Sequence, residues 1–299
     1  MAQLREIKDR ISSIEGTQKI TNAMYMIATT KLRHAKEYRD RNAVYFNALK
    51  NLVERLLRHV PDTDNRYLKK VDKPRDRQVH GYLVITADKG LAGAYNLNVQ
   101  KETERLIRER GGHSRLFVVG MTGRRYFDHH GIPMEPDFNY SAEEPTHHLG
   151  RLIMRAIFPL YTSGELDDIM IVYTAMKSAM EVEVRARQLL PLVSQLDRTD
   201  MLLSHGLTSG VSNEEFLFSP SVDEVVDAVV PNYMNGYIYS ALIESYCSEQ
   251  NSRMLAMQTA SDAAVSITRD LTMQYNRERQ KAITQEITEV SAGAEALKR

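Results

Sequence analysis

Proline is missing from both ends of this chain, although the sequence of 299 residues contains nine prolines. All nine lie between Pro61 and Pro231. A proline inside a helix costs roughly 3 kcal/mol, because it removes a hydrogen bond and collides with the preceding turn. The two ends therefore predict long uninterrupted helices, well beyond the mean length of about 11–12 residues. Helices of that length span a distance, which favours a mechanical role over an active site.

Three further absences exclude whole classes of protein. The single cysteine, Cys247, cannot form an intrachain disulfide and indicates a reducing compartment. The first residues contain no apolar signal core, and no apolar run approaches the about 18 residues of a membrane span, so we expect a soluble or peripheral protein. The dipeptide Gly-Lys is also absent, which excludes the phosphate-binding loop GxxxxGKS or GxxxxGKT.

Net charge is zero, with 39 Lys and Arg against 39 Asp and Glu, and this balance argues against a dedicated nucleic-acid binder. The charge is unevenly distributed, because residues 1–60 carry 12 basic against 6 acidic side chains. The basic side chains concentrate at Lys31, Arg33, Lys36, Arg39 and Arg41. They form either a solvated helix face or a binding surface for an acidic partner.

Apolar spacing indicates how the two helical ends pair. Near the start the spacing is that of a coiled-coil seam, at Leu4, Ile7, Ile11 and Ile14. The same register then meets polar residues from Gln18 onward, and a shifted apolar stripe follows at Ile20, Met24 and Ile27. Near the end a polar belt at 274–281 precedes a second seam, at Ile283, Ile287, Val290, Ala294 and Leu297. Two such arms most economically pair as an antiparallel coiled coil.

The middle of the chain alternates strand and helix patterns. Strands are predicted at 80–86, 115–119, 169–174 and 181–190, the last as a hairpin partner, and helices at 99–110, 123–130 and 149–160. Such alternation implies a mostly parallel sheet. The predicted fold is therefore α-rich α+β, a long antiparallel coiled coil of N- and C-terminal helices plus a central Rossmann-like α/β domain. The predicted domains are a discontinuous shaft at 1–60 and 211–299, a linker at 61–77, the α/β domain at 78–200 and a return loop at 201–210.

Candidate chemistry is sparse. The turn at 90–93 follows a strand but lacks the GxGxxG spacing, so a plain β–α turn is favoured over a dinucleotide loop. The histidines at 129, 130, 147 and 148 lack companion carboxylates at metal-binding spacing. We therefore predict no catalytic residue, no cofactor and no metal. The polar belt interrupts two good seams, which favours a contact site over a merely solvated surface, at Arg279, Gln280, Thr284 and Glu286.

Four motifs in the expected order resemble the gamma subunit of the F-type rotary ATP synthase. The N-terminal motif reads TQKIT at 17–21 and continues through 23–32, and the C-terminal motif reads RQKAITQEITE at 279–289, followed by GAEAL at 293–297. Between them, ITADKGLAGAYN at 85–96 and SEQNSRM at 248–254 also fit. The resemblance covers essentially the whole chain, although 194–218 matches weakly. Ala92 stands where many relatives carry cysteine.

That resemblance implies the central rotor shaft, a non-catalytic subunit that couples proton-driven rotation to conformational change at the beta-subunit catalytic sites. The implied partners are three alpha and three beta subunits, epsilon and the membrane c-ring, with no nucleic acid. The implied location is peripheral, on the cytoplasmic face of a bacterial cell membrane. Two alternatives remain open, a nucleotide-binding α/β enzyme and a free-standing coiled-coil adaptor.

The resemblance also assigns residues to contacts. The beta subunits' catch loop would meet Arg279, Gln280, Thr284 and Glu286. Contact or packing along the shaft would involve Lys19, Met24, Ile283 and Ile287. The acidic lever of the beta subunits would lie near the lower shaft, at Lys31, Arg33, Lys36, Asp88, Lys89, Gly90, Leu91 and Ala92.

Overall fold

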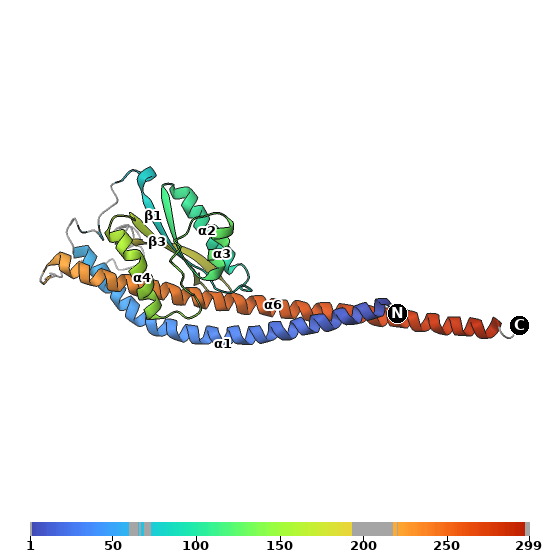
Figure 1. The fold of residues 1–299 in the computed structure, drawn as a ribbon. Coiled ribbons are helices and arrows are strands. Elements are labelled where there is room, and N and C mark those ends of the chain that lie inside the picture. Colours follow the sequence, from blue (N-terminus) through green and yellow to red (C-terminus); the bar gives the residue numbers. More distant parts are fainter. Residues whose placement is uncertain are drawn as a thin grey trace, which may run out of the picture. The chain divides into compact units, whose positions relative to one another are not determined.

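The computed structural model describes residues 2–59, 65, 67–68, 73–192, 218–219 and 221–296. Two helices dominate it, α1 at Ala2–His59 and α6 at Val222–Ala296 (Figure 1). The two long terminal helices are therefore confirmed. Pro231 lies inside α6 and does not end it, because buried Val226, Val230 and Met234 anchor the helix on both sides of it.

The chain divides into two compact units, which we call the helical unit and the α/β unit. The helical unit comprises Met1–Thr30 and Arg253–Arg299, and the α/β unit comprises Lys31–Ser252. Each of the two long helices contributes to both units. The predicted return loop at 201–210 and most of the predicted linker at 61–77 lie outside the described residues.

A four-stranded sheet forms the centre of the α/β unit. Its strands are β1 at Val79–Ile85, β2 at His113–Val119, β3 at Asp168–Met176 and β4 at Val182–Leu190. The order is β2-β1-β3-β4, with β1 parallel to β2 and β3, and β4 antiparallel to β3. All four predicted strands, the mostly parallel sheet and the hairpin are confirmed.

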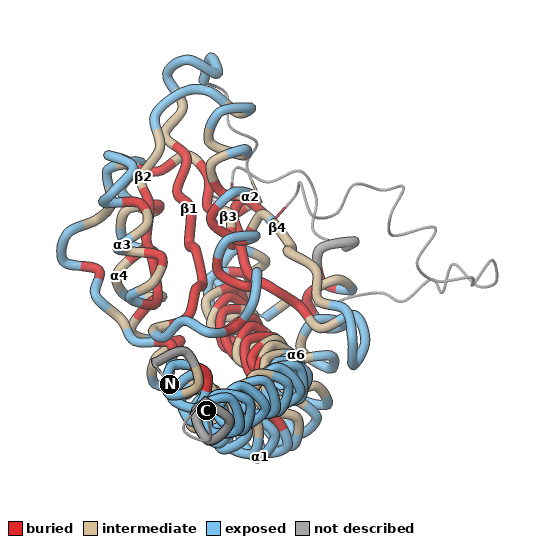
Figure 2. The backbone as a smooth tube through the Cα atoms, turned by 90° about the vertical axis from the view of Figure 1, so that its right-hand side faces the viewer, coloured by how far each residue is buried: buried red, intermediate tan, exposed pale blue. Residues whose placement is uncertain are grey.

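Helices cover both faces of this sheet, so its central strands are buried (Figure 2). On one face α2 at Tyr95–Arg110 and α3 at Met121–His129 pack on a cluster around Tyr82, Val84 and Phe127. On the other face α4 at His147–Thr162 joins α1 and α6 on a larger cluster that includes Leu83, Ile85 and Ile171. The carboxyl ends of β1, β2 and β3 thus share one edge of the sheet, where the turn at 86–94 lies.

Polar contacts attach α6 to that carboxyl edge. Tyr95 Oη lies 2.7 Å from Ser245 Oγ, and both side chains are buried. Ser248 Oγ donates to the Thr174 carbonyl at 3.1 Å, and Met176 N donates to Glu244 Oε1 at 3.1 Å. Within the α/β unit, hydrogen bonds as well as apolar packing therefore hold α6 against the sheet.

Within the helical unit the packed seam of α1 differs from the predicted one. The register of Ile7 continues through Thr21 to Ala28, and all three residues are buried. Ile20 and Ile27, predicted as a shifted stripe, are exposed instead. The threonine and alanine side chains are small and allow the two helices to pack closely, although Thr21 is polar and Ala28 offers less apolar surface than the isoleucines of the predicted stripe. The predicted interruption of the seam is therefore wrong.

The seam of α6 also continues through the polar belt. Met257 and Ala264 are buried, and Tyr275, Glu278 and Ala282 at the same spacing are half-buried. Beyond Ala282, residues 283–292 are all exposed. Of the second seam predicted beyond the belt, Ile283, Ile287 and Val290 therefore do not pack within the described part of this chain, and Leu297 lies outside it.

Candidate functional site

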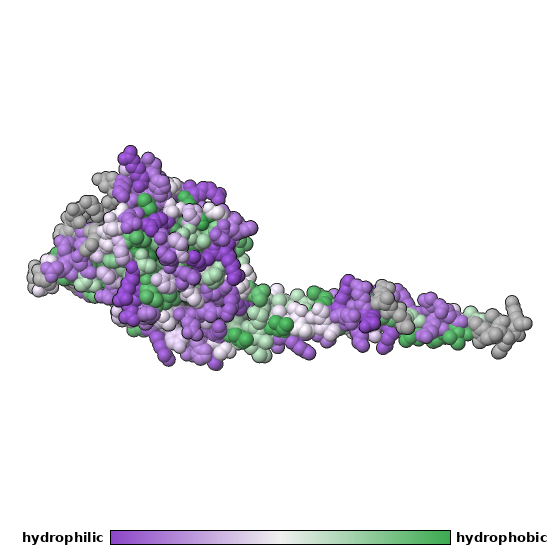
Figure 3. Space-filling model, in the orientation of Figure 1, coloured by the Kyte–Doolittle hydropathy of each residue, from purple (hydrophilic) through white to green (hydrophobic). Residues whose placement is uncertain are grey.

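The end of α6 carries an exposed apolar stripe. Ile283, Ile287 and Val290 have exposed fractions of 48%, 62% and 68%. Their expected packing inside the helix pair is not found among the described residues, where all three side chains are exposed. Figure 3 shows hydrophobic residues interspersed with polar ones along this helical unit. A role for Ile283 and Ile287 as contacts to a partner remains a prediction.

Polar residues flank the stripe on both sides. At about 100° per residue, Arg279 and Glu286 fall on one side of the three apolar residues, and Gln280 and Thr284 on the other. All four polar residues are exposed. The sequence placed these four residues in a common contact site, and the helix does bring them onto one face, with the apolar stripe between the two pairs.

The charged flank is unpaired within the described part of the chain, where neither Arg279 nor Glu286 makes an ion pair. By contrast, Lys281 Nζ lies 2.7 Å from Glu278 Oε1. Thr284 Oγ1 donates to the Gln280 carbonyl at 2.9 Å, which fixes its rotamer on the helix. The flank therefore presents one free cation and one free anion, separated by two turns of helix.

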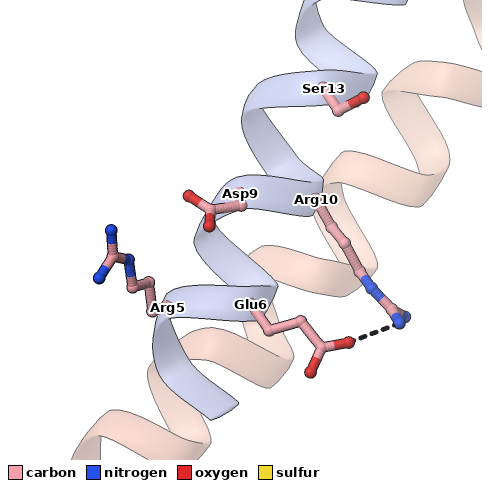
Figure 4. A pocket seen from close by; sticks show the side chains of 5 residues that line it. All are labelled: Arg5, Glu6, Asp9, Arg10 and Ser13. Atoms are coloured by element: carbon pink, nitrogen blue, oxygen red, sulfur yellow. Dashed lines mark hydrogen bonds and ion pairs between the residues drawn. The ribbon is translucent and has the colours of Figure 1, made fainter. Parts of the chain in front are cut away.

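Two shallow recesses lie on the surface of the helical unit. One is lined by residues of α1, with Glu6 Oε1 bound to Arg10 Nη2 at 2.7 Å across it, and Arg5, Asp9 and Ser13 around it (Figure 4). The other is lined by residues of the polar flank of α6, Arg277, Gln280, Lys281, Thr284, Gln285, Thr288 and Glu289. Both are open helix surfaces suited to side chains of another protein rather than enclosed pockets for a small ligand.

The residues predicted on α1 occupy different environments. Lys19 is exposed, whereas Met24 is half-buried. In the α/β unit Lys31 and Arg33 are exposed, but Lys36 is half-buried. Lys36 and Arg39 lie close enough to Cys247 of α6 to favour its thiolate, although burial dominates and raises the thiol pKa to about 12. Lys31 and Arg33 are therefore more available to a partner than Lys36.

The turn at 86–94 is tied to its surroundings by side chains whose roles the sequence did not reveal. Asp88 accepts three hydrogen bonds, from Met121 N at 3.0 Å, Ser141 Oγ at 2.6 Å and Ala142 N at 2.7 Å. Lys89 pairs with Glu143. The Asp88 carboxylate thus accepts its hydrogen bonds from within this chain, and the Lys89 ammonium has an acidic partner. The predicted contact residues at 88–92 therefore offer little unpaired charge to another protein.

Two of the exposed or half-buried histidines, His130 and His147, lie against tyrosine rings. The ring centroids of His147 and Tyr239 are 3.7 Å apart, and those of His130 and Tyr126 are 4.1 Å apart. Among the described residues, no group of three or more His, Cys, Asp or Glu side chains could hold a metal ion.

None of the described helices combines the length and apolarity needed to cross a membrane.

Comparison with known proteins gives a consistent result. A family model described as ATP synthase matches residues 3–297. The ATP synthase gamma chain of Ruminiclostridium cellulolyticum is 36% identical over 294 residues, covering 98% of both chains. That of Caldanaerobacter subterraneus subsp. tengcongensis is 38% identical over 297 residues, covering 97% of this chain and 98% of the relative.

Solved structures share the fold. A chain of the Euglena gracilis mitochondrial ATP synthase superimposes with a TM-score of 0.63 at 14% identity, covering 99% of this chain and 95% of that one. A chain of the Tetrahymena thermophila mitochondrial ATP synthase, from a structure of its central stalk and c-ring, gives a TM-score of 0.54 at 23% identity. It covers 81% of this chain and 99% of its own length.

Proposed function

The chain belongs to the gamma-chain family of ATP synthase, and we propose that it is the central rotor shaft of that complex. In this role it carries rotation from the membrane rotor to the catalytic head and forces the catalytic sites of the beta subunits through successive affinities. The chain performs no bond chemistry itself. Its contribution is a rigid-body switching mechanism, in which one element turns and its neighbours repack.

The observation that best supports this function is the unpartnered end of α6. Its apolar stripe, Ile283, Ile287 and Val290, has no counterpart among the described residues of the chain, and polar residues flank it on both sides. An apolar centre with a polar rim is the usual anatomy of a protein interface. A sleeve formed by three alpha and three beta subunits would cover the stripe, and the beta catch loop would meet Arg279, Gln280, Thr284 and Glu286.

Individually weak contacts suit the surface of a shaft that turns against the surrounding subunits. Exposed ion pairs contribute roughly 0–1 kcal/mol each, so contacts through Arg279 and Glu286 can form and break without trapping the shaft. The exposed cations Lys31 and Arg33 would face the acidic lever of the beta subunits. Epsilon and the c-ring would bind the α/β unit, and the whole chain would be peripheral, on the cytoplasmic face of a bacterial membrane.

Co-purification from native membranes tests this proposal directly. A tagged copy of the chain should bring down alpha and beta subunits in stoichiometric amounts, together with ATP hydrolysis that is coupled to proton pumping. A homodimer without alpha and beta would favour the coiled-coil adaptor. Titration of the isolated chain with ATP, ADP and NAD should show no stoichiometric binding, and saturable binding at the turn 90–93 would favour the nucleotide-binding enzyme.

Substitution of the charged flank tests the contact site. Arg279→Ala and Glu286→Ala should each lower coupled ATP turnover of the assembled head and leave the melting temperature of the isolated chain within about 1 °C, because both side chains are exposed. Arg269→Ala is the matched control, since Arg269 is an exposed arginine of the same helix that lines neither the contact site nor the recess beside it. Unchanged coupled turnover in both test variants would count against the site.

A further inference from the structure

Within the α/β unit the two long helices contact each other through residues that repeat every seven positions. On α1 the residues of this repeat are all buried or half-buried, at Leu32, Ala35, Arg39, Asn42, Phe46, Leu49, Val53 and Leu56. On α6 the same spacing and the same burial are found at Gly236, Ser240, Ile243, Cys247 and Gln250. A seven-residue repeat coincides with itself when one helix slides by seven residues, about 10 Å along its axis. Spacing alone therefore permits more than one register, and a polar residue in the repeat can select one of them.

A hydrogen bond joins the two helices at one position of this repeat. Asn42 Nδ2 donates to Ser240 Oγ at 2.7 Å, and both residues are half-buried. One heptad away on either side of Asn42, the equivalent residues of α1 are Ala35 and Leu49. Apolar side chains thus fill the equivalent places, and packing alone does not require an asparagine at residue 42. The amide adds a directional contact that its apolar counterparts cannot make.

A second contact, one turn away, matches the same register. Phe46 follows Asn42 by one turn of α1, and Gly236 precedes Ser240 by one turn of α6. A Cβ atom added at residue 236 would lie 3.2 Å from Phe46 Cδ2, so the ring occupies the space that a side chain would need. The largest side chain of this part of α1 therefore meets the residue of α6 that has no side chain. Both contacts form together when residue 42 stands opposite residue 240.

A slide of one heptad in either direction removes the hydrogen bond. In one direction Ala35 would stand opposite Ser240, and in the other direction Leu49 would. Neither side chain can donate or accept a hydrogen bond, so Ser240 and Asn42 would both lose their partner. A polar group removed from water without a partner costs more free energy than an apolar contact of the same shape. The hydrogen bond therefore disfavours both slipped registers, and an apolar residue 42 would not.

We propose that Asn42 is a positioning residue, whose hydrogen bond to Ser240 selects one axial register of α1 against α6 within the α/β unit. A polar residue of this kind lowers stability and increases structural specificity, as a single asparagine does in coiled coils. The inference goes beyond the proposed function and does not depend on it, because it concerns contacts within this chain.

The distance between two spin labels reports this register. The labels are attached to the full chain at exposed positions, through Asn47→Cys on α1 and Ala228→Cys on α6, with Cys247→Ala so that no other thiol reacts. With Asn42 intact, double electron–electron resonance should give a single distance. In Asn42→Leu and in Asn42→Ala a second distance should appear, displaced by up to about 10 Å, because a slide of seven residues moves one helix by that length.

The melting temperature separates a choice of register from ordinary stabilisation. Asn42→Leu should melt at or above the temperature of the labelled parent protein, because leucine adds apolar burial and is a better helix former, although two distances are present. If the hydrogen bond were merely stabilising, its loss in Asn42→Ala would lower the melting temperature and leave a single distance. That result in Asn42→Ala, with a single distance in Asn42→Leu as well, would overturn the proposal.

Asn51→Leu is the matched control, because Asn51 is an exposed asparagine of α1 that lies outside the repeat. It should keep the single distance of the parent protein. A second distance in this control would also overturn the proposal, since the register would then not depend on the hydrogen bond. The isolated chain is measured without alpha and beta subunits, so neither outcome bears on the proposed function, which co-purification tests separately.

Discussion

Gly236 of α6 lies directly against the ring of Phe46 of α1, where an added Cβ atom would sit 3.2 Å from Phe46 Cδ2. The ring itself is held by Tyr233, stacked at 5.8 Å between centroids, and by Tyr237, edge-on at 5.8 Å. Because three aromatic rings pack around this point, Phe46 cannot move away easily. The close approach of the two helices in the α/β unit therefore depends on the absence of a side chain at residue 236.

A leucine at this position should destabilise the chain. We expect Gly236→Leu to cost about 1–3 kcal/mol through overpacking of the aromatic cluster. Thermal unfolding followed by circular dichroism measures the effect. Gly16→Leu is the control, because apart from its chain neighbours and the nearby backbone of its own helix nothing lies within 4 Å of the Cβ position there. That substitution should be neutral or stabilising, since leucine is a better helix former than glycine. Equal losses at both positions would refute the packing argument.

Removal of the Asp88 carboxylate should loosen the turn at 86–94. Asp88→Ala leaves Met121 N, Ser141 Oγ and Ala142 N without their acceptor, at an expected cost of about 2 kcal/mol. Urea unfolding of the isolated chain gives the free energy. Asp137→Ala, at an exposed loop aspartate, should change that free energy by less than about 0.5 kcal/mol. A loss no greater in Asp88→Ala than in this control would show that the three bonds contribute nothing.

The isoleucines at the end of α6 should matter for assembly and not for folding. The double variant Ile283→Gln with Ile287→Gln should unfold at the wild-type temperature, because both side chains are exposed. Its retention by alpha and beta subunits in gel filtration should fall sharply. Ile7→Gln is the opposite case, since Ile7 is buried, and it should lower the stability of the isolated chain by about 2 kcal/mol or more. A stability loss in the double variant would place the isoleucines in an intrachain seam after all.

Cys247 should make the chain less stable in alkali. Burial raises its pKa from 9.0 to about 12, so the folded state keeps the proton while the unfolded state loses it above pH 9. The stabilising contribution is complete below pH 9 and is lost as the pH rises from 9 towards 12, by up to about 1.4 kcal/mol per unit. Urea unfolding between pH 7 and 10 measures the slope. The slope should be shallower in Cys247→Ala, and parallel curves for the two proteins would contradict the prediction.

The sequence predicted the elements well because their signals are local. Absence of proline predicted both long helices, and alternating patterns predicted all four strands and the hairpin. The pairing of the helices was harder, because it depends on size as much as on polarity. Thr21 and Ala28 occupy the seam, whereas Ile20 and Ile27, which look like better core residues, are exposed. A periodicity analysis that weights hydrophobicity alone selects the wrong stripe.

The site was only partly accessible from the sequence. The spacing of Arg279, Gln280, Thr284 and Glu286 fixes their common face once the helix is assumed. That Ile283 and Ile287 are exposed in the described part of the chain depends on how α1 and α6 pair within the helical unit, which is a tertiary fact. The positive φ of Leu91 leaves no sequence signal either, because leucine is a poor indicator of that conformation.

The run of α6 past Ala282 has a consequence for the unassembled protein. Residues 283–292 of α6 are all exposed, so among the described residues this part of the helix is held by its own backbone hydrogen bonds rather than by tertiary packing. In the isolated chain we therefore expect this segment to fray, and to be cut by proteases, before the packed part of α6.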